Sequence, residues 1–309
     1  MRENFPAIVA LGEPLVEFNQ VHADDPRAYL QGFGGDTSNM VIAAARLGAS
    51  AGYITRVGDD MFGRLFLALW RDEHVDARGV AIDGTAPTGV YFVTHGPHGH
   101  EFSYLRAGSA ASKIATGNLP HDVIRRARVL HLSAISQAIS VSACDAAFAA
   151  TTVARGAGVK VSYDTNLRLK LWSLARARET IFSSLAHCDW CLPSLDDARA
   201  LFDTDDVGAI LDACHAKGAP VVVLKCGSRG CAVSDGARRE AIPGHIVASV
   251  DATGAGDCFD GAYAARVVAG DNPFAAARYA NAAAAIATTG FGAVQPLPRD
   301  ADVRALIAQ

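Results

Sequence analysis

The sequence predicts an α/β fold built around a mostly parallel, doubly wound β-sheet. Short apolar segments alternate with segments of helical periodicity over most of its 309 residues. This alternation is typical of βαβ units, in which each right-handed crossover lays a helix on one face of the sheet. Buried parallel strands also read as continuous apolar runs, as residues 221–224 do.

The apolar runs and helical periods assign most of the chain. Strands are expected at 7–11, 51–57, 129–132, 159–163, 190–192 and 221–225. Helices are expected at 37–47, 61–73, 142–154, 175–186, 207–216, 258–269 and 275–288. After residue 255 the pattern is helical and rich in Ala.

Two segments interrupt the alternation. Residues 15–33 lack a helical period, and residues 88–105 read as two strands around a turn at 95–99. Both are expected to project from the main sheet as antiparallel strands and to form one small sheet. We therefore predict a single domain over residues 1–309, with a lid from about 14–33 and 88–107 inserted in it. An exposed small sheet has open edges, which favours self-association.

Composition excludes several classes of protein. Half of the residues are hydrophobic, 7% are aromatic, and the formal net charge is −4. No run of Lys and Arg suggests a nucleic-acid or membrane partner, and no apolar segment is long enough for a membrane span. Seven Cys residues without a disulfide pattern indicate a reducing compartment, so a cytoplasmic protein is expected.

The run DATGAGD at residues 251–257 is the most specific motif. Its small residues Gly254, Ala255 and Gly256 stand before a predicted helix, where free N–H groups and the helix dipole favour a bound phosphate. Asp257 would repel such a ligand, but it suits a general base that accepts a proton from an attacking hydroxyl. The structural alternative is a tight turn with Asp257 as helix cap.

A second polar stretch precedes the first long helix. Gly34 and Gly35 are followed by Asp36 and Asn39, whose side chains could hydrogen-bond the hydroxyl groups of a polyol. Capping of the helix by Asp36 or Thr37 explains the same residues equally well.

Two arginines follow predicted strands. Tyr104 and Arg106 end the second lid segment, while Asp164, Asn166 and Arg168 follow the strand at 159–163. Ligands collect at the carboxyl ends of parallel strands, and two guanidinium groups in one cleft suit a carboxylate or a phosphate. For either arginine alone, a surface salt bridge is the ordinary alternative.

A Gly-bearing turn follows the strand at 221–225. Lys225, Gly227 and Gly230 could hold a nucleotide, or the turn could simply form a hairpin into 231–234. A dinucleotide-binding site is disfavoured because Gly254-x-Gly256-x-x-Phe259 lacks the third small residue. A Walker P-loop is excluded, since Gly-Lys occurs nowhere in the chain.

Together these motifs resemble the ribokinase-like (PfkB-type) carbohydrate kinases, from Leu11 to Gly292. The resemblance implies a Rossmann-like core with a small β-sheet lid, ATP as donor and Mg²⁺. It also implies that Asp257 is the base and that the N–H groups of residues 254–257 neutralise charge on the transferred phosphoryl group. A homodimer joined through the lids is a further expectation of the family.

Within that family the chain is most similar to the 2-keto-3-deoxygluconate kinases, on Glu13, Tyr91, 104–106, 109–112 and 164–172. A sugar acid carries a carboxylate that neutral sugars lack, and two arginines would bind it. The substrate is then expected to contact Gly34, Gly35, Asp36, Asn39, Tyr91, Tyr104, Arg106, Asp164, Arg168 and Asp257. ATP is expected to contact Asn166, Ser194, Lys225, Gly227, Gly230, Gly254, Gly256 and Asn281.

The chain departs from the family pattern near the metal. Ser194 and Asp197 stand where Asn-x-x-Glu is usual, so Asp197 is the remaining candidate ligand for Mg²⁺. Asp251 and Thr253 are the family's candidates for a monovalent cation such as K⁺. Two alternatives to a sugar-acid kinase stay open: a kinase for a neutral sugar such as fructose or ribose, and a non-catalytic sensor of sugar acids or nucleotides.

Overall fold

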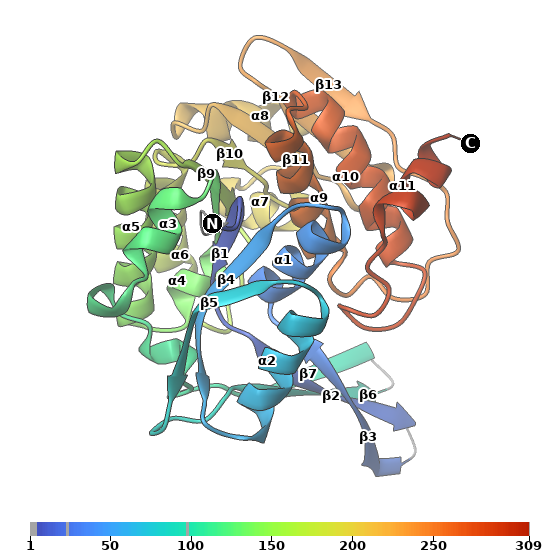
Figure 1. Cartoon of the computed structure of the whole chain (residues 1–309). Coiled ribbons are helices and arrows are strands. Elements are labelled where there is room, and N and C mark those ends of the chain that lie inside the picture. Colours follow the sequence, from blue (N-terminus) through green and yellow to red (C-terminus); the bar gives the residue numbers. More distant parts are fainter. Residues whose placement is uncertain (1–4, 23–24, 97–98, 309) are drawn as a thin grey trace.

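The large sheet of the molecule has nine strands and runs through its centre (Figure 1). The computed structural model describes residues 5–22, 25–96 and 99–308. The strand order is β13-β12-β11-β10-β9-β8-β1-β4-β5, and all neighbours are parallel except at β12 and β13. The strands are β1 (Ile8–Leu11), β4 (Ala51–Gly58), β5 (Asp76–Asp83), β8 (Val129–Ser133), β9 (Lys160–Asp164), β10 (Trp190–Cys191), β11 (Val221–Lys225), β12 (Cys231–Ser234) and β13 (Arg239–Ile242).

Helices cover both faces of this sheet (Figure 1). Side chains alternate along β1, so Ile8 and Ala10 join the hydrophobic core on one face, and Val9 and Leu11 join the core on the other. The first face carries α1 (Asp36–Arg46), α2 (Met61–Asp72), α9 (Ala255–Ala269), α10 (Pro273–Ala287) and α11 (Asp300–Ile307). The second carries α3 (His121–Arg126), α4 (Ala134–Ala138), α5 (Val141–Gly156), α6 (Leu174–Leu185), α7 (Leu195–Phe202) and α8 (Val207–Ala216).

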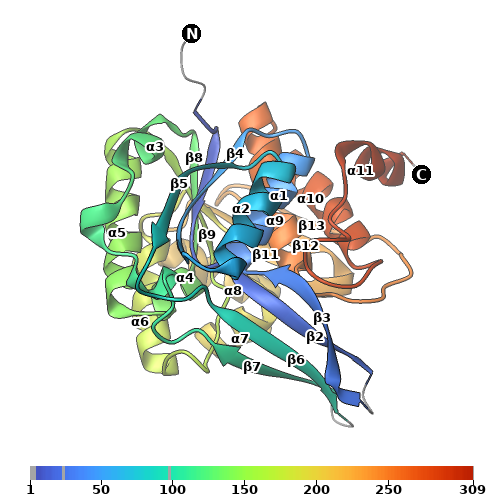
Figure 2. The same cartoon turned by 60° about the horizontal axis from the view of Figure 1, so that its bottom comes forward.

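A second, four-stranded sheet projects beyond the first on the side where strand β1 ends (Figure 2). Its strands are β2 (Leu15–His22), β3 (Asp25–Gly34), β6 (Val90–Gly96) and β7 (Gly99–Leu105), in the order β3-β2-β6-β7. This lid sheet joins the two segments that were predicted to pair, although β2 and β6 run parallel to each other. The tip of the predicted turn at 95–99 lies partly outside the described residues.

The predicted α/β fold with a lid is confirmed, and the differences have physical reasons. Helix α9 begins at Ala255 rather than at 258, because Gly254 alone takes the left-handed conformation before it. Strand β5 went unpredicted because it is a partly exposed edge strand without a continuous apolar run. The short helices α3, α4, α7 and α11 also went unpredicted, since segments of five to eight residues carry little periodicity.

Strand order reverses direction at β1. The chain passes from β1 to β4 and β5 on one side, and returns at β8 to fill the other. Ligands of doubly wound sheets bind at such a switch point, outside the carboxyl ends of the strands. The N-terminus of α1 lies at the same edge of the sheet, since Asp36 contacts Ser133 at the end of β8. None of the helices in the described ranges has the length and apolar character that crossing a bilayer requires.

Candidate active site

The anion cradle is the first turn of α9. Gly254 is its N-cap residue with φ 75°, and its carbonyl accepts from the N–H of Cys258 at 2.8 Å. Among the described residues, a Cβ on Gly256 would have one neighbour within 4 Å, the Nζ of Lys225 at 3.7 Å, so this backbone is open. Asp257 lies in the same first turn and makes no side-chain cap, which disfavours the alternative of a capping aspartate.

Asp257 has the electrostatics of a base that works near neutral pH. Burial raises the pKa of its carboxyl group from 3.8 to about 7, and the negative charge of Asp36 adds to the rise. The amide of Asn39 opposes it by donating from Nδ2 to Oδ2 of Asp257 at 2.8 Å. A base with a pKa near the working pH is efficient in proton transfer. Asn39 and Asp257 are therefore brought together, as the sequence predicts.

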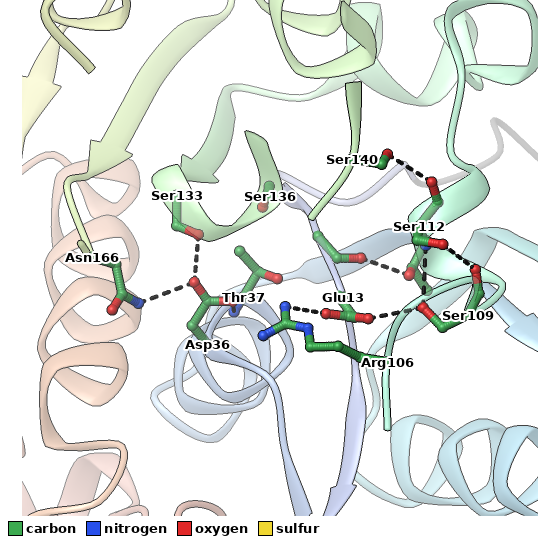
Figure 3. A network of polar contacts seen from close by, with 12 residues as sticks. Glu13, Asp36, Thr37, Arg106, Ser109, Ser112, Ser133, Ser136, Ser140 and Asn166 are labelled. Carbon is green, nitrogen blue, oxygen red and sulfur yellow. Dashed lines mark hydrogen bonds and ion pairs between the residues drawn. The ribbon is translucent and has the colours of Figure 1, made fainter. Parts of the chain in front are cut away.

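Asp36 is the centre of a second polar cluster (Figure 3). Its Oδ2 accepts from the hydroxyl of Ser133 and from Nδ2 of Asn166 at 3.0 Å, while Oδ1 accepts from the N–H of Thr37 at 2.8 Å. Burial raises the pKa of Asp36 despite these donors. Asn166, expected at ATP, is thus held beside the predicted substrate residue Asp36.

Two glycines join the lid to α1, and each is required by close approach. A Cβ on Gly34 would lie 2.6 Å from the hydroxyl oxygen of Tyr91. Gly35 has φ 103°, and a Cβ there would lie 2.4 Å from the carbonyl oxygen of Glu13. Gly35 is also the N-cap residue of α1, a position that the sequence offered to Asp36 or Thr37, although Asp36 does accept from the first-turn N–H of Thr37.

Arg106 is paired inside the protein with Glu13, a residue to which the sequence assigned no charge partner (Figure 3). The guanidinium donates through one terminal nitrogen to Glu13, whose other oxygen accepts from Ser109 at 2.9 Å. Burial raises the pKa of Glu13, and the charge of Arg106 opposes that rise. The Nε of Arg106 is buried without an acceptor among the described residues.

The aromatic side chains of the lid stack above this pair. The rings of Tyr91 and Tyr104 stack with centroids 5.7 Å apart, and the guanidinium of Arg106 lies 5.4 Å from the Tyr104 ring centre. Tyr91 donates its hydroxyl to the buried carboxylate of Glu17, which fixes the ring. Tyr104 keeps 40% of its surface exposed and so remains available to a ligand.

Arg168 differs from Arg106 because no ion pair holds it within the described part of the chain. Its side chain is exposed and donates to the carbonyl oxygen of the adjacent Leu167 at 2.9 Å. Its positive charge acts on Asp36, Asp197 and Tyr104, which places it among the site residues.

Asp164 lies with Lys225 and Asp260 in a buried ionic cluster beneath the anion cradle. Lys225 Nζ is 3.2 Å from Asp164 Oδ1 and 3.0 Å from Asp260 Oδ1. Burial opposes ionisation of Asp164, but the charge of Lys225 lowers its pKa; burial and Asp164 raise the pKa of Asp260. Asp260 went unrecognised in the sequence, although it stands one helical turn after Asp257.

The glycine turn after β11 forms the predicted hairpin. Residues 227–229 make a short 3₁₀ turn between the antiparallel strands β11 and β12. Gly230 has φ 92°, and a Cβ there would lie 2.1 Å from the carbonyl oxygen of Ile242. Asn281, expected at ATP, donates to the carbonyl oxygen of Pro243 at 2.7 Å and so fixes the segment after β13.

The candidate metal residues are engaged in local contacts. Ser194 is the N-cap of α7 and accepts from the N–H of Asp197 at 3.1 Å, while Asp197 Oδ2 accepts from Thr165 at 3.2 Å. Burial raises the pKa of Asp197. Within the described ranges, no group of three or more His, Cys, Asp or Glu side chains is placed to hold a metal ion. A single carboxylate nevertheless fits Mg²⁺ that is bound mainly by water and phosphate oxygens.

Asp251 fastens the loop that leads to the cradle. Its Oδ1 accepts from the N–H and the hydroxyl of Thr253, at 2.9 and 2.7 Å, and its Oδ2 accepts from the N–H of Gly292 at 2.9 Å. These contacts join the segments before α9 and after α10. Asp251 and Thr253 therefore offer K⁺ few side-chain oxygens that do not already take part in these hydrogen bonds.

Comparison with known proteins identifies the family. Residues 7–300 match the profile of the pfkB family carbohydrate kinases. The chain belongs to this family. Fructokinase-2 from Zea mays is 35% identical over 317 residues, which cover 98% of this chain and 94% of that protein. A 2-dehydro-3-deoxygluconokinase from Thermoproteus tenax is 34% identical over 310 residues, covering 96% and 93%.

Solved structures of pfkB-type kinases agree with this fold over nearly the whole chain. A putative ribokinase II from E. coli, in complex with ATP and Mg²⁺, has a TM-score of 0.90 at 25% identity and covers 98% of this kinase and 99% of that chain. A fructokinase from Vibrio cholerae O395, bound to fructose, ADP and calcium ion, has a TM-score of 0.87 at 27% identity and covers 97% and 98%.

Proposed function

We propose that this kinase transfers the γ-phosphoryl group of ATP to the terminal hydroxyl of 2-keto-3-deoxygluconate, giving the 6-phosphate and ADP. The observation that carries the choice of a sugar acid is Arg168, an arginine among the site residues without an ion pair in the described structure. A substrate carboxylate is the natural partner of such a guanidinium. The orphaned Nε of Arg106 adds a second donor on the side of Tyr104.

The proton and the phosphoryl group move at the N-terminus of α9. Asp257 accepts the proton of the sugar hydroxyl while the oxygen of that hydroxyl bonds to the γ-phosphorus of ATP. The bond between the γ-phosphorus and the β,γ-bridging oxygen breaks, and ADP leaves. The N–H of Ala255 donates to the carbonyl oxygen of Ala252 at 3.2 Å, so the N–H groups of Gly256 and Asp257, at the positive end of the helix dipole, would stabilise the charge on the transferred group. Lys225 adds a positive charge beneath them.

ATP as donor is supported by the related ribokinase II, which was solved with ATP and Mg²⁺. The proposed nucleotide residues are Asn166, Ser194, Lys225, Gly227, Gly230, Gly254, Gly256 and Asn281. Asp197 would hold the metal, which supplies charge neutralisation at the phosphates. A monovalent cation near Asp251 and Thr253 remains part of the proposal; a fructokinase double mutant from Vibrio cholerae was solved with potassium.

A neutral sugar such as fructose is the second candidate. Glu13 neutralises Arg106, which leaves Arg168 as the one charge available for a carboxylate among the two arginines. Several fructokinases, including the maize protein above, are similar to this chain over nearly its whole length. The hydroxyl groups of a neutral sugar would bind to Asp36 and Asn39 in the same way.

The deciding experiment compares kcat/KM for 2-keto-3-deoxygluconate, fructose and ribose in an assay coupled to ADP formation. Arg168→Ala should lower kcat/KM for the sugar acid by about 10- to 100-fold, which is the range for a lost charged hydrogen bond. The value of kcat/KM for fructose should not change. Arg199→Ala is the matched control, since Arg199 is exposed and pairs with Asp196. A native preference for fructose or ribose would contradict the sugar-acid assignment and leave the kinase intact.

Self-association through the lids belongs to the same proposal. Leu30 and Phe102 lie on the face of the lid sheet that also carries Tyr91, and they are 68% and 37% exposed. Burying them between two copies would stabilise a dimer. Light scattering should show a dimer that Leu30→Lys dissociates, whereas Ile307→Lys on α11 should not. A monomer at assay concentration contradicts this proposal.

A further inference from the structure

Helices α1 and α9 run parallel and touch so closely that a glycine is required between them. A Cβ on Gly261 would lie 2.4 Å from the carbonyl oxygen of Met40 and 2.8 Å from the Cβ of Ala43. Backbone oxygen cannot retreat from such a contact without moving the helix. Gly261 is therefore the residue that sets the separation of α1 from α9.

The same contact lies one turn from the candidate base. Gly261 follows Asp257 by four residues on α9, and Ala43 follows Asn39 by four residues on α1. Residues four apart share a helix face, so the two pairs stack along the same interface. The distance between α1 and α9 at Gly261 thus controls the 2.8 Å hydrogen bond from Asn39 to Asp257.

Asn39 is arranged to fix one oxygen of the base and to leave its own oxygen for a ligand. Its side chain is 3% exposed, and Nδ2 donates to Oδ2 of Asp257. Its Oδ1 is buried without a hydrogen-bond partner in the described structure. An amide oxygen that is left unpaired costs stability, which a bound hydroxyl would recover.

We propose that Gly261 is a positioning residue for phosphoryl transfer. By letting α1 approach α9, it holds Asn39 against Oδ2 of Asp257, so that Oδ1 of Asp257 faces the acceptor hydroxyl. This inference rests on the proposed role of Asp257 as base. It assigns to a glycine, which has no side chain to touch a ligand, an effect on kcat rather than on nucleotide binding.

The test is a double-mutant cycle on kcat. Gly261→Ala should lower kcat by about 10- to 100-fold, the cost of displacing a reacting group by roughly 1 Å, with KM for ATP unchanged. Because Gly261 acts through Asn39, adding Gly261→Ala to Asn39→Ala should change kcat by less than about twofold. Gly156→Ala is the matched control: Gly156 ends α5, and no neighbouring atom of the described residues lies within 4 Å of its Cβ position.

The pH profile gives a second readout that a purely structural role would not move. Asp36, Asp164 and Lys225 also act on Asp257, and all three remain in Asn39→Ala. Loss of the amide donor should therefore raise the pH at which kcat is half-maximal. If Gly261→Ala does not fold, Ala43→Ser adds one atom at the same contact from the other helix, and the same cycle applies.

Three outcomes overturn the inference. The first is a kcat of Gly261→Ala within about twofold of the native value, and the second is that the effects of Gly261→Ala and Asn39→Ala on kcat are independent. The third is that Asn39→Ala leaves unchanged the pH at which kcat is half-maximal. Asp257→Asn separates this failure from that of the proposed function. If Asp257→Asn still turns over, the base is misassigned; if it is inactive while Gly261→Ala is normal, only the positioning role fails.

Discussion

Lys225 is bound to Asp260 from the same helix that carries the candidate base, with two contacts of 3.0 and 3.1 Å. It also contacts Asp164 at the end of β9, so one ammonium group ties β9, β11 and α9 together. The two carboxylates raise the pKa of Lys225 in spite of its burial, and the group stays charged throughout the working range of the enzyme. The first turn of α9, the candidate phosphate site, thus lies beside a fixed positive charge.

Removing that charge should destabilise the protein. Lys225→Met leaves two buried carboxyl groups without their cation, which typically costs about 3–5 kcal/mol of unfolding free energy. The loss should shrink in acid, because the buried carboxyl groups of the variant, without a cation beside them, take up protons there. Urea denaturation at pH 8 and pH 5 measures both effects. Lys160→Met is the control, because Lys160 is 59% exposed in its pair with Asp189 and should cost at most about 1 kcal/mol.

The activity should depend on pH near neutrality. A base must be unprotonated to accept a proton, and the pKa of Asp257 is about 7. With saturating substrates, kcat should therefore be flat above pH 8 and fall about tenfold per pH unit below 6. Excess coupling enzyme at each pH serves as the control. A profile that stays flat down to pH 5 would contradict a buried, raised carboxyl group as the base.

The base should also be a source of instability. In the folded protein Asp257 keeps its proton up to about pH 7, whereas the unfolded chain releases it near 3.8. The native protein therefore loses unfolding free energy as pH rises from about 4 to 7, by at most about 4 kcal/mol. Asp257→Asn should remove this loss and become more stable than native at pH 8. If the native protein had the same unfolding free energy at pH 4 and at pH 8, this would argue against the raised pKa of Asp257.

The pairing of Glu13 with Arg106 should limit selectivity for acids. Glu13→Gln keeps an acceptor for Arg106 and Ser109 but removes the neutralising charge. We expect the ratio of kcat/KM for the sugar acid to that for fructose to rise by on the order of tenfold, which is about 1.4 kcal/mol. Glu73→Gln, whose partner Arg46 lies outside the site, is the control. An unchanged ratio would remove Arg106 from the carboxylate site.

The sequence predicted those parts of the fold whose pattern is local. Strand β11 and helix α8 have the bounds that their apolar periods predict, and the two lid segments pair with each other, although in parallel rather than in the antiparallel direction expected. Strand β5 was not predicted, because an edge strand is partly exposed and does not require a continuous apolar run. The true start of α9 depends on the left-handed conformation of Gly254, and a sequence of small residues does not locate such a backbone.

Several of the candidate site residues that the sequence predicts lie close together in the structure, but which of them pair with one another was not predictable. Asp257 and Asn39 lie 218 positions apart and meet as expected. Glu13 pairs with Arg106, and Asp164 pairs with Lys225. These pairings depend on which charged side chains are buried next to one another. Local patterns carry no such information, because the relevant neighbours come from different strands. Asp260 was overlooked for the same reason.

Gly35 alone separates strand β3 of the lid from helix α1. The lid and the helix that bears Asp36 and Asn39 are therefore continuous in the chain. Gly35 is fixed between them by its positive φ and by the nearby carbonyl oxygen of Glu13. A ligand that contacts the lid at Tyr104 would thus also act on the backbone that carries Asn39, the hydrogen-bond partner of Asp257.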